Sequence, residues 1–277
     1  MQADGIISNT ITEDIRQKGH QTIRFSPDGF SLLVSDASYR PVVLKRYLYD
    51  HPVEIAEQTA DCIRILRESD LFNFQGETVL IADTLNSTLV PQPFFDEKLG
   101  RALLERNAPL DPSDQVRHRQ IRNRSLMLLF AVPANLLDIE SQFSGHVTLI
   151  HATESLISLS DQVQASDHQR GMILIDVQPL TLNILVIRED KIRLLNQYVL
   201  NEPSEFIYHT LNTVKQLGLD RETIPVYLSG TIHEEHELYG LLGKYIRTIR
   251  TTPYYMEELN RMDVIRYMIL SEASKCA

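Results

Sequence analysis

Cysteine, basic charge and long apolar runs are all scarce in this sequence, and each absence excludes a class of protein. Only two cysteines occur, Cys62 and Cys276, at a separation that fits no metal-binding motif, so we expect a reducing, cytoplasmic setting. The formal net charge of −10 argues against nonspecific binding to nucleic acid or to an anionic membrane, because both need a basic surface. No apolar run approaches the ~18 residues of a membrane span, and residues 1–20 lack a signal-peptide core, so neither insertion nor export is expected.

The composition that remains is that of an ordinary globular protein. Of the 277 residues, 43% are hydrophobic and 23% are charged, which is enough for a substantial core in one large domain or in two lobes. The order of the expected strands and helices distinguishes one large domain from two lobes.

The expected elements fall into two similar series. Each series opens with three short apolar runs separated by turn residues, such as "PDG" after the first run, which is typical of an antiparallel meander. The meanders are expected at 21–26, 30–36 and 41–49, and again at 171–177, 180–188 and 191–200. The other runs predict helices at 53–68, 93–107, 134–142, 153–164, 204–217, 234–245 and 257–274, and strands at 78–83, 125–133, 146–152, 225–230 and 245–251. Residues 1–20 are expected to form a loose arm and residues 108–124 a connection.

The ends of the two meanders indicate an internal duplication. "RYLYDHPVEI" (46–55) and "QYVLNEPSEF" (197–206) share Tyr, Pro and Glu at the same positions, and each run contains a strand end, a proline turn and a helix start. The alternative is two unrelated meanders with a chance match. On the duplication hypothesis the chain consists of an arm (1–20), a first lobe (21–165) and a second lobe (166–277).

This duplicated strand–strand–strand–helix–strand order resembles the actin-like ATPase fold of the ribonuclease H-like group. The resemblance implies an α/β protein of two lobes, each with a mixed sheet begun by a three-strand meander and flanked by helices. In that group the first hairpin of each lobe carries an Asp-x-Gly pattern and the two hairpins hold the phosphates of ATP. The aspartate orients Mg²⁺ and its waters, and the glycine lets backbone N–H groups approach the phosphate.

The chain departs from this pattern at the positions that matter for chemistry. Asp176 stands at the aspartate position of the second hairpin, but Val177, Gln178 and Pro179 follow it instead of glycines, and Pro179 has no N–H to donate. In the first hairpin the aspartate position falls on Phe25 or Ser26. The Asp28 of "PDG" is expected to point to water.

A third motif of the group, a strand followed by two glycines, is half retained. "VYLSGT" keeps Gly230 and has Thr231 in place of the second glycine. If a nucleotide binds, the resemblance assigns its binding to Asp176 and Gly230. A lone aspartate at a strand end otherwise accepts hydrogen bonds within its own turn.

These losses resemble the degenerate branch of the group, which includes assembly scaffolds of the PilM and GspL types, and most of all a bacterial family known only by its domain number. We therefore interpret the chain as a non-catalytic cytoplasmic scaffold, with no catalytic residue, metal or cofactor assigned. The alternative is an ATP-binding phosphotransferase or ATPase with a divergent site around Asp176. A nuclease is disfavoured, because two-metal cleavage needs several converging carboxylates and no acid ends "TIRFS" or "VYLSG".

Two polar clusters are further candidates for binding. Arg117, Arg119, Arg122 and Arg124 are concentrated within an acidic chain, so they are the expected surface for a protein partner, the alternative being a solvated connection. "HEEH" (233–236) places two histidines at i, i+3, where a metal is geometrically feasible. Acidic residues favoured at a helix N-terminus explain this motif more simply.

Overall fold

The computed structural model of the chain describes residues 1–51, 53–106, 109–163, 165–202, 204–254, 256 and 259–276. It separates into two compact units, unit 1 with Met1–Glu154 and Ala273–Ala277, and unit 2 with Ser155–Glu272. The units are described one at a time. The arm and lobe bounds expected from the sequence stay a prediction.

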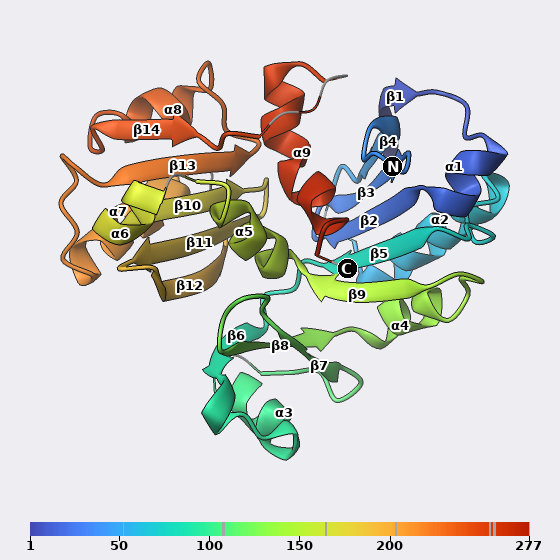
Figure 1. The fold of residues 1–277 in the computed structure, drawn as a ribbon, viewed down its shortest axis with the longest axis horizontal. Coiled ribbons are helices and arrows are strands. Elements are labelled where there is room, and N and C mark those ends of the chain that lie inside the picture. The colour runs from blue at the N-terminus through green and yellow to red at the C-terminus, as the bar shows by residue number, and fades with distance from the viewer. Residues whose placement is uncertain are drawn as a thin grey trace. The chain divides into compact units, whose positions relative to one another are not determined.

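The described residues of unit 1 form a six-stranded mixed sheet in the order β1-β4-β3-β2-β5-β9. Strands β2, β3 and β4 are the antiparallel meander, and β5 and β9 run parallel to β2 (Figure 1). The strand bounds are β1 Gln2–Ser8, β2 His20–Ser26, β3 Gly29–Ser35, β4 Pro41–Leu48, β5 Glu77–Ala82 and β9 Val147–His151. The helices of this unit are α1 Glu13–Lys18, α2 Ile55–Glu68 and α4 Ala134–Glu140.

The first twenty residues are more ordered than a loose arm. Strand β1 pairs antiparallel with β4, and Thr12 caps α1 by accepting the N–H of Ile15. All residues of β1 lie at the surface or are only half-buried. A strand without a buried face has no apolar alternation, so the sequence gives no signal for it.

A second, three-stranded sheet of unit 1 has the order β6-β8-β7 within the described residues, with β6 Ser87–Pro91, β7 Gln115–Gln120 and β8 Leu126–Val132. The helix expected at 93–107 is broken into two 3₁₀ turns, Gln92–Phe94 and Glu97–Leu99, and α3 Gly100–Leu104. The Asp96 side chain caps the second turn by accepting the N–H of Lys98, and Gly100 disfavours a helix interior, so both favour the break. Residues 107 and 108 lie outside the described chain.

Unit 2 repeats the sheet of unit 1 without its edge strand. Its described strands follow the order β12-β11-β10-β13-β14, with an antiparallel meander and two further parallel strands (Figure 1). The bounds are β10 Met172–Val177, β11 Thr181–Arg188, β12 Lys191–Val199, β13 Pro225–Gly230 and β14 Thr248–Thr251. The helices are α5 Ala152–Ser160, which begins in unit 1, α6 Ala165–Arg170, α7 Glu205–Gln216, α8 Glu237–Leu242 and α9 Arg261–Ala273. The shared order supports the duplication hypothesis, which stays a prediction.

Helices α6 and α7 cover opposite faces of the unit 2 sheet. On one face, Ile173 and Ile175 of β10 belong to the same apolar cluster as Phe206 and Val214 of α7. On the other face, Tyr227 of β13 donates a hydrogen bond to Asp167 of α6. Side chains that alternate along a strand produce this arrangement.

The last helix, α9, is shorter than the range 257–274 expected for it, and residues 257 and 258 lie outside the described chain. Ile265, Met268 and Ile269 of the expected apolar stripe are buried, while 44% of Met262 is exposed. No helix in the described residues has the length and apolar character needed to cross a bilayer.

Candidate functional site

Asp176 lies where the meander hairpin of unit 2 meets the neighbouring parallel strand. Strand β10 pairs with β13 so that Asp176 is opposite Ser229. One carboxylate oxygen, Oδ1, accepts hydrogen bonds from Ser229 Oγ and from Gln178 Nε2, both at 3.0 Å. Only 1% of the residue is exposed. The carboxylate is therefore enclosed by protein side chains rather than directed to solvent.

Gly230, one residue beyond Ser229, is paired with Val177, the residue after Asp176. Its φ is +90°, and a Cβ built on it would be 2.0 Å from the carbonyl oxygen of Val177. The same oxygen accepts the N–H of Thr231 at 2.7 Å and its hydroxyl at 3.1 Å. The glycine thus allows β10 and β13 to approach closely at their ends.

The equivalent junction of unit 1 carries a cation at the position of Asp176. In unit 1 the N–H of Asp83 is donated to the carbonyl of Phe25, just as the N–H of Thr231 is donated to Val177 in unit 2. This register makes Arg24 the counterpart of Asp176. The sequence placed the aspartate position of the first hairpin at Phe25 or Ser26, so the structure moves it back by one or two residues.

Arg24 and Asp83 form a buried ion pair at this junction. Arg24 Nη2 and Nε lie 2.5 and 3.2 Å from Asp83 Oδ2, and the two side chains are 6% and 0% exposed. The other oxygen, Asp83 Oδ1, is buried without a hydrogen-bond partner among the described residues. A pair this buried is stable only while both partners are present, because either charge alone would be left without water.

His151, at the end of β9, is the third member of this cluster. Its ring nitrogens contact the hydroxyl of Thr153 at 2.7 Å and the carbonyl oxygen of Thr84 at 2.9 Å. Burial lowers the pKa of His151 and the Arg24 charge acts in the same direction, while Asp83 and the Thr84 carbonyl oppose the change. The neutral imidazole is therefore the form that the fold favours.

The hairpin between β2 and β3 is also closed by its own side chains. Asp28 was expected to point to water, but it is 8% exposed and accepts hydrogen bonds from Arg46 and from Ser26 Oγ, each at 2.7 Å. Asp28 is buried because Arg46 neutralises it. Arg46 lies on β4, two strands from β2, so no local sequence pattern indicates this contact. Gly29 has φ +148° and approaches the carbonyl of Tyr47.

The chemistry available at the two junctions is limited. Each hairpin has proline as the first residue of its turn, Pro27 or Pro179, and proline offers no N–H to a phosphate. The carboxylates of Asp28, Asp83 and Asp176 already have protein partners. Within the described ranges, no group of three or more His, Cys, Asp or Glu side chains is placed to hold a metal ion.

The arginine-rich segment forms strand β7 and the turn after it, not a loose connection. Arg119 binds the Glu154 carboxylate at 2.8 Å and the Cys276 carbonyl at 3.0 Å, and Arg122 lies 3.5 Å from the Lys275 carbonyl. Arg117 exposes 46% of its side chain and lies 4.0 Å from Glu140. Arg124 also has a protein partner. Burial raises the pKa of Glu154, while the Arg119 charge opposes that change.

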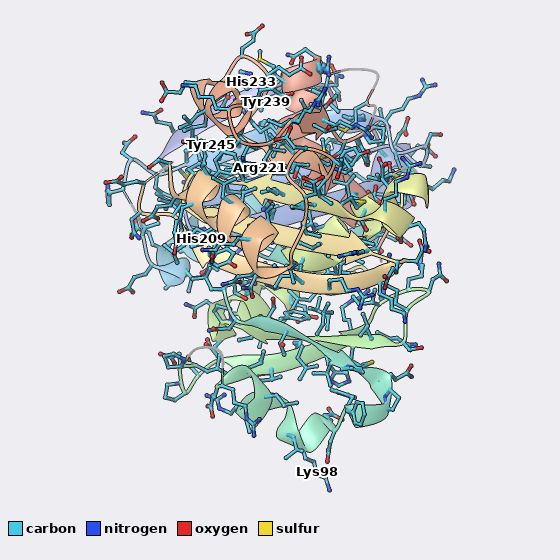
Figure 2. All side chains as sticks on the ribbon, turned by 90° about the vertical axis from the view of Figure 1, so that its left-hand side faces the viewer. Lys98, His209, Arg221, His233, Tyr239 and Tyr245 are labelled. Carbon is cyan, nitrogen blue, oxygen red and sulfur yellow. The ribbon has the colours of Figure 1, made fainter. Side chains whose placement is uncertain are left out.

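The "HEEH" segment lies before α8, where Figure 2 labels His233 and Tyr239. Each histidine accepts a backbone N–H through Nδ1, His233 from Glu235 at 3.3 Å and His236 from Leu238 at 3.2 Å. His236 is the N-cap of α8. A capping role, with acidic residues near the helix start, agrees with the simpler interpretation of this motif.

Sequence reasoning missed Arg24, Asp83 and His151. Asp83 ends the apolar run "TVLIAD" as Asp176 ends "GMILID", so the rule that selected Asp176 applies to it equally. Arg24 interrupts the apolar run "TIRF", which is a second usable signal. The pairing of the two, 59 positions apart, needs the parallel alignment of β2 and β5.

Comparison with known structures confirms the actin-like fold. A protein of unknown function with an actin-like ATPase fold from Bacteroides thetaiotaomicron VPI-5482 has a TM-score of 0.76 and 17% identity, with 97% of this chain and 100% of that chain covered. A PilM–PilN type IV pilus biogenesis complex has a TM-score of 0.56 and 13% identity over 94% of this chain and 98% of that one.

The sequence comparisons assign a family but no activity. A search of curated proteins finds no match. The model of a protein family of unknown function, DUF3822, matches residues 8–249. The chain therefore belongs to the DUF3822 family.

Proposed function

We propose that this protein is an actin-like scaffold for protein interaction, and that it does not hydrolyse ATP. The observation that carries the proposal is the buried Arg24–Asp83 pair, which stands in unit 1 where an ATPase of this fold has its phosphate-loop aspartate. A guanidinium cannot bind Mg²⁺, and its own carboxylate partner already neutralises it. The proline turns and the enclosed Asp176 carboxylate support the same conclusion.

One of the two structural neighbours belongs to a protein assembly. The PilM–PilN structure is described as a biogenesis complex of two proteins, so a chain of this fold takes part in a protein complex there. At 13% identity this likeness establishes the fold alone. This likeness supports the proposal only by showing that a protein of this fold can be part of a protein complex.

We place the partner surface at β7 and the turn that follows, with Arg117, Arg119, Arg122 and Arg124. Strand β7 is the edge of its sheet in the described chain, and Arg117 and Arg122 are exposed. Guanidinium groups suit carboxylates on a partner. Arg119 has a second role, because it neutralises Glu154, and replacing it would disturb the fold as well as the surface.

The test is co-purification with a tagged protein in which Arg117 and Arg122 are changed to Gln. We expect a specific partner to be captured by the natural chain and lost from this variant, with an unchanged melting temperature. The control carries Arg40→Gln and Arg106→Gln, two exposed arginines elsewhere in unit 1 with the same loss of charge. Equal capture by both variants would refute this placement of the surface.

A further inference from the structure

We propose that unit 2 holds a second binding site, for a small organic anion with an apolar body, at the end of its sheet opposite Asp176. Gly171 begins this end, directly before β10, and Arg188 closes β11 beside it. The site is separate from the two hairpin junctions and does not depend on the proposed scaffold role.

A cavity opens at this end of the sheet. Its volume is about 430 Å³, and it is lined by Arg170, Gly171, Arg188, Gly218, Leu219, Asp220, Thr223 and Ile224. A neighbouring cavity of about 400 Å³ shares Arg188 and Leu219 with it and adds Val186, Glu189, Arg193 and Leu217. Each volume lies in the range of small-molecule sites, which is roughly 300–1,000 Å³.

Two arginines lie next to Gly171 at this cavity. Its φ is +118°, a conformation that favours glycine, and a Cβ at this position would lie 3.6 Å from Arg188 Cγ. The stem of Arg188 therefore passes over Gly171, and Arg170 is the residue directly before it. Both residues line the cavity.

Neither of these arginines is neutralised by the protein. In the part of the chain that the structure describes, neither side chain makes a hydrogen bond or an ion pair, whereas Arg193, in the neighbouring cavity, pairs with Glu189. Asp220 accepts hydrogen bonds from Glu222 N and Thr223 Oγ1 in its own turn, each at 3.0 Å. Both arginines are exposed, so their positive charge is available to an anion from solution.

The lining also defines the ligand. Guanidinium forks suit the oxygen pairs of a phosphate or a carboxylate. Leu219 and Ile224 give the cavity apolar walls, and Gly218 has no atom within 4 Å of a built Cβ, which leaves space for the ligand's body. We therefore expect an anionic group at the arginines and an apolar group beside the leucine and isoleucine.

Calorimetric titration of the full chain with phenyl phosphate, phenylacetate and phenol tests this site. We expect at least one of the two anions to bind at millimolar concentration, more weakly at high ionic strength, and phenol not to bind. Whichever anion binds more tightly identifies the phosphate or the carboxylate as the natural group. Failure of both anions to bind would overturn the proposal.

Variants then locate the binding. Arg170→Gln together with Arg188→Gln keeps the apolar stems and removes both charges, so we expect at least a tenfold loss of affinity with an unchanged melting temperature. The control, Arg40→Gln with Arg106→Gln, removes equal charge from unit 1 and should bind as the natural chain does. If the double variant lowers the melting temperature, each single variant is titrated instead, and either should weaken binding. Undiminished binding by the variants would refute this site.

Discussion

The hairpin junctions of the two units have the same topology and opposite charges. Arg24 and Asp176 occupy equivalent positions, each beside the end of the next parallel strand. Arg24 is neutralised by Asp83, whereas Asp176 is held by the hydroxyl of Ser229 and the amide of Gln178. The two junctions share one strand register, while the side chains that they place there differ completely.

The neighbouring position differs in a similar way. Ala82 of β5 pairs with Phe25, and Gly230 of β13 pairs with Val177. A Cβ is accommodated in unit 1 but would lie 2.0 Å from a carbonyl oxygen in unit 2. The positive φ of Gly230 directs a Cβ toward β10, whereas Ala82 carries its Cβ without a positive φ.

The largest expected effect comes from breaking the ion pair of unit 1. Arg24→Met leaves the Asp83 carboxylate buried without its cation, so the free energy of unfolding should fall by about 4 kcal/mol. Urea denaturation measures this change. Combining it with Asp83→Leu should restore most of the loss, because no charge is then buried. A double variant as unstable as the single one would show that the pair is not the cause.

Substitutions at Gly230 and at its counterpart in unit 1, Ala82, should change stability by different amounts. Gly230→Ala should lower the free energy of unfolding by about 3 kcal/mol, through its positive φ and the contact with Val177. The matched change in unit 1, Ala82→Gly, should cost only about 1 kcal/mol. Equal costs by urea denaturation would contradict the difference in backbone conformation at this position.

Removing the acid of unit 2 should cost less than removing the cation of unit 1. Asp176→Ala leaves Ser229 Oγ and Gln178 Nε2 without this acceptor, so we expect about 2 kcal/mol of destabilisation. From the strand-end pattern alone, an aspartate that only caps its turn predicts a loss of about 1 kcal/mol or less for Asp176→Ala. We expect a larger loss because Asp176 is buried. Ser229→Ala, which removes one of the two bonds, should give a smaller effect. If Asp176→Ala lowered the free energy of unfolding as much as Arg24→Met does, the proposed difference between the two junctions would be wrong.

The smallest effect concerns His151 and pH. The pKa of His151 is lower in the folded chain than in the unfolded chain, where it is about 6.5. As pH falls, the unfolded chain therefore binds a proton before the folded chain does. Stability should therefore decrease as pH falls below about 6.5, by roughly 1 kcal/mol for each pH unit until the folded pKa is reached. Melting curves between pH 7 and pH 5 should show a shallower dependence for His151→Gln than for the natural chain. The exposed His118, changed to Gln, controls for the substitution itself and should leave the melting temperature at pH 7 unchanged.

Local sequence patterns predicted the sheets well and the polar junctions poorly. The two meanders appear close to their expected positions, because alternation and turn residues are local signals. Strand β7 was expected to be a connection, since its alternating arginines resemble a solvated segment. The Arg24–Asp83 pair and the Asp28–Arg46 contact depend on strand pairing between distant segments, which no local window contains.

The melting temperature with and without Mg-ATP tests directly whether the protein is a scaffold or an ATPase. An actin-like ATPase at a ligand concentration a hundredfold above its dissociation constant would gain about 2.7 kcal/mol. We expect no shift for the natural chain at millimolar Mg-ATP. A shift that disappears in Asp176→Ala would contradict the scaffold proposal and establish a divergent nucleotide site around that residue.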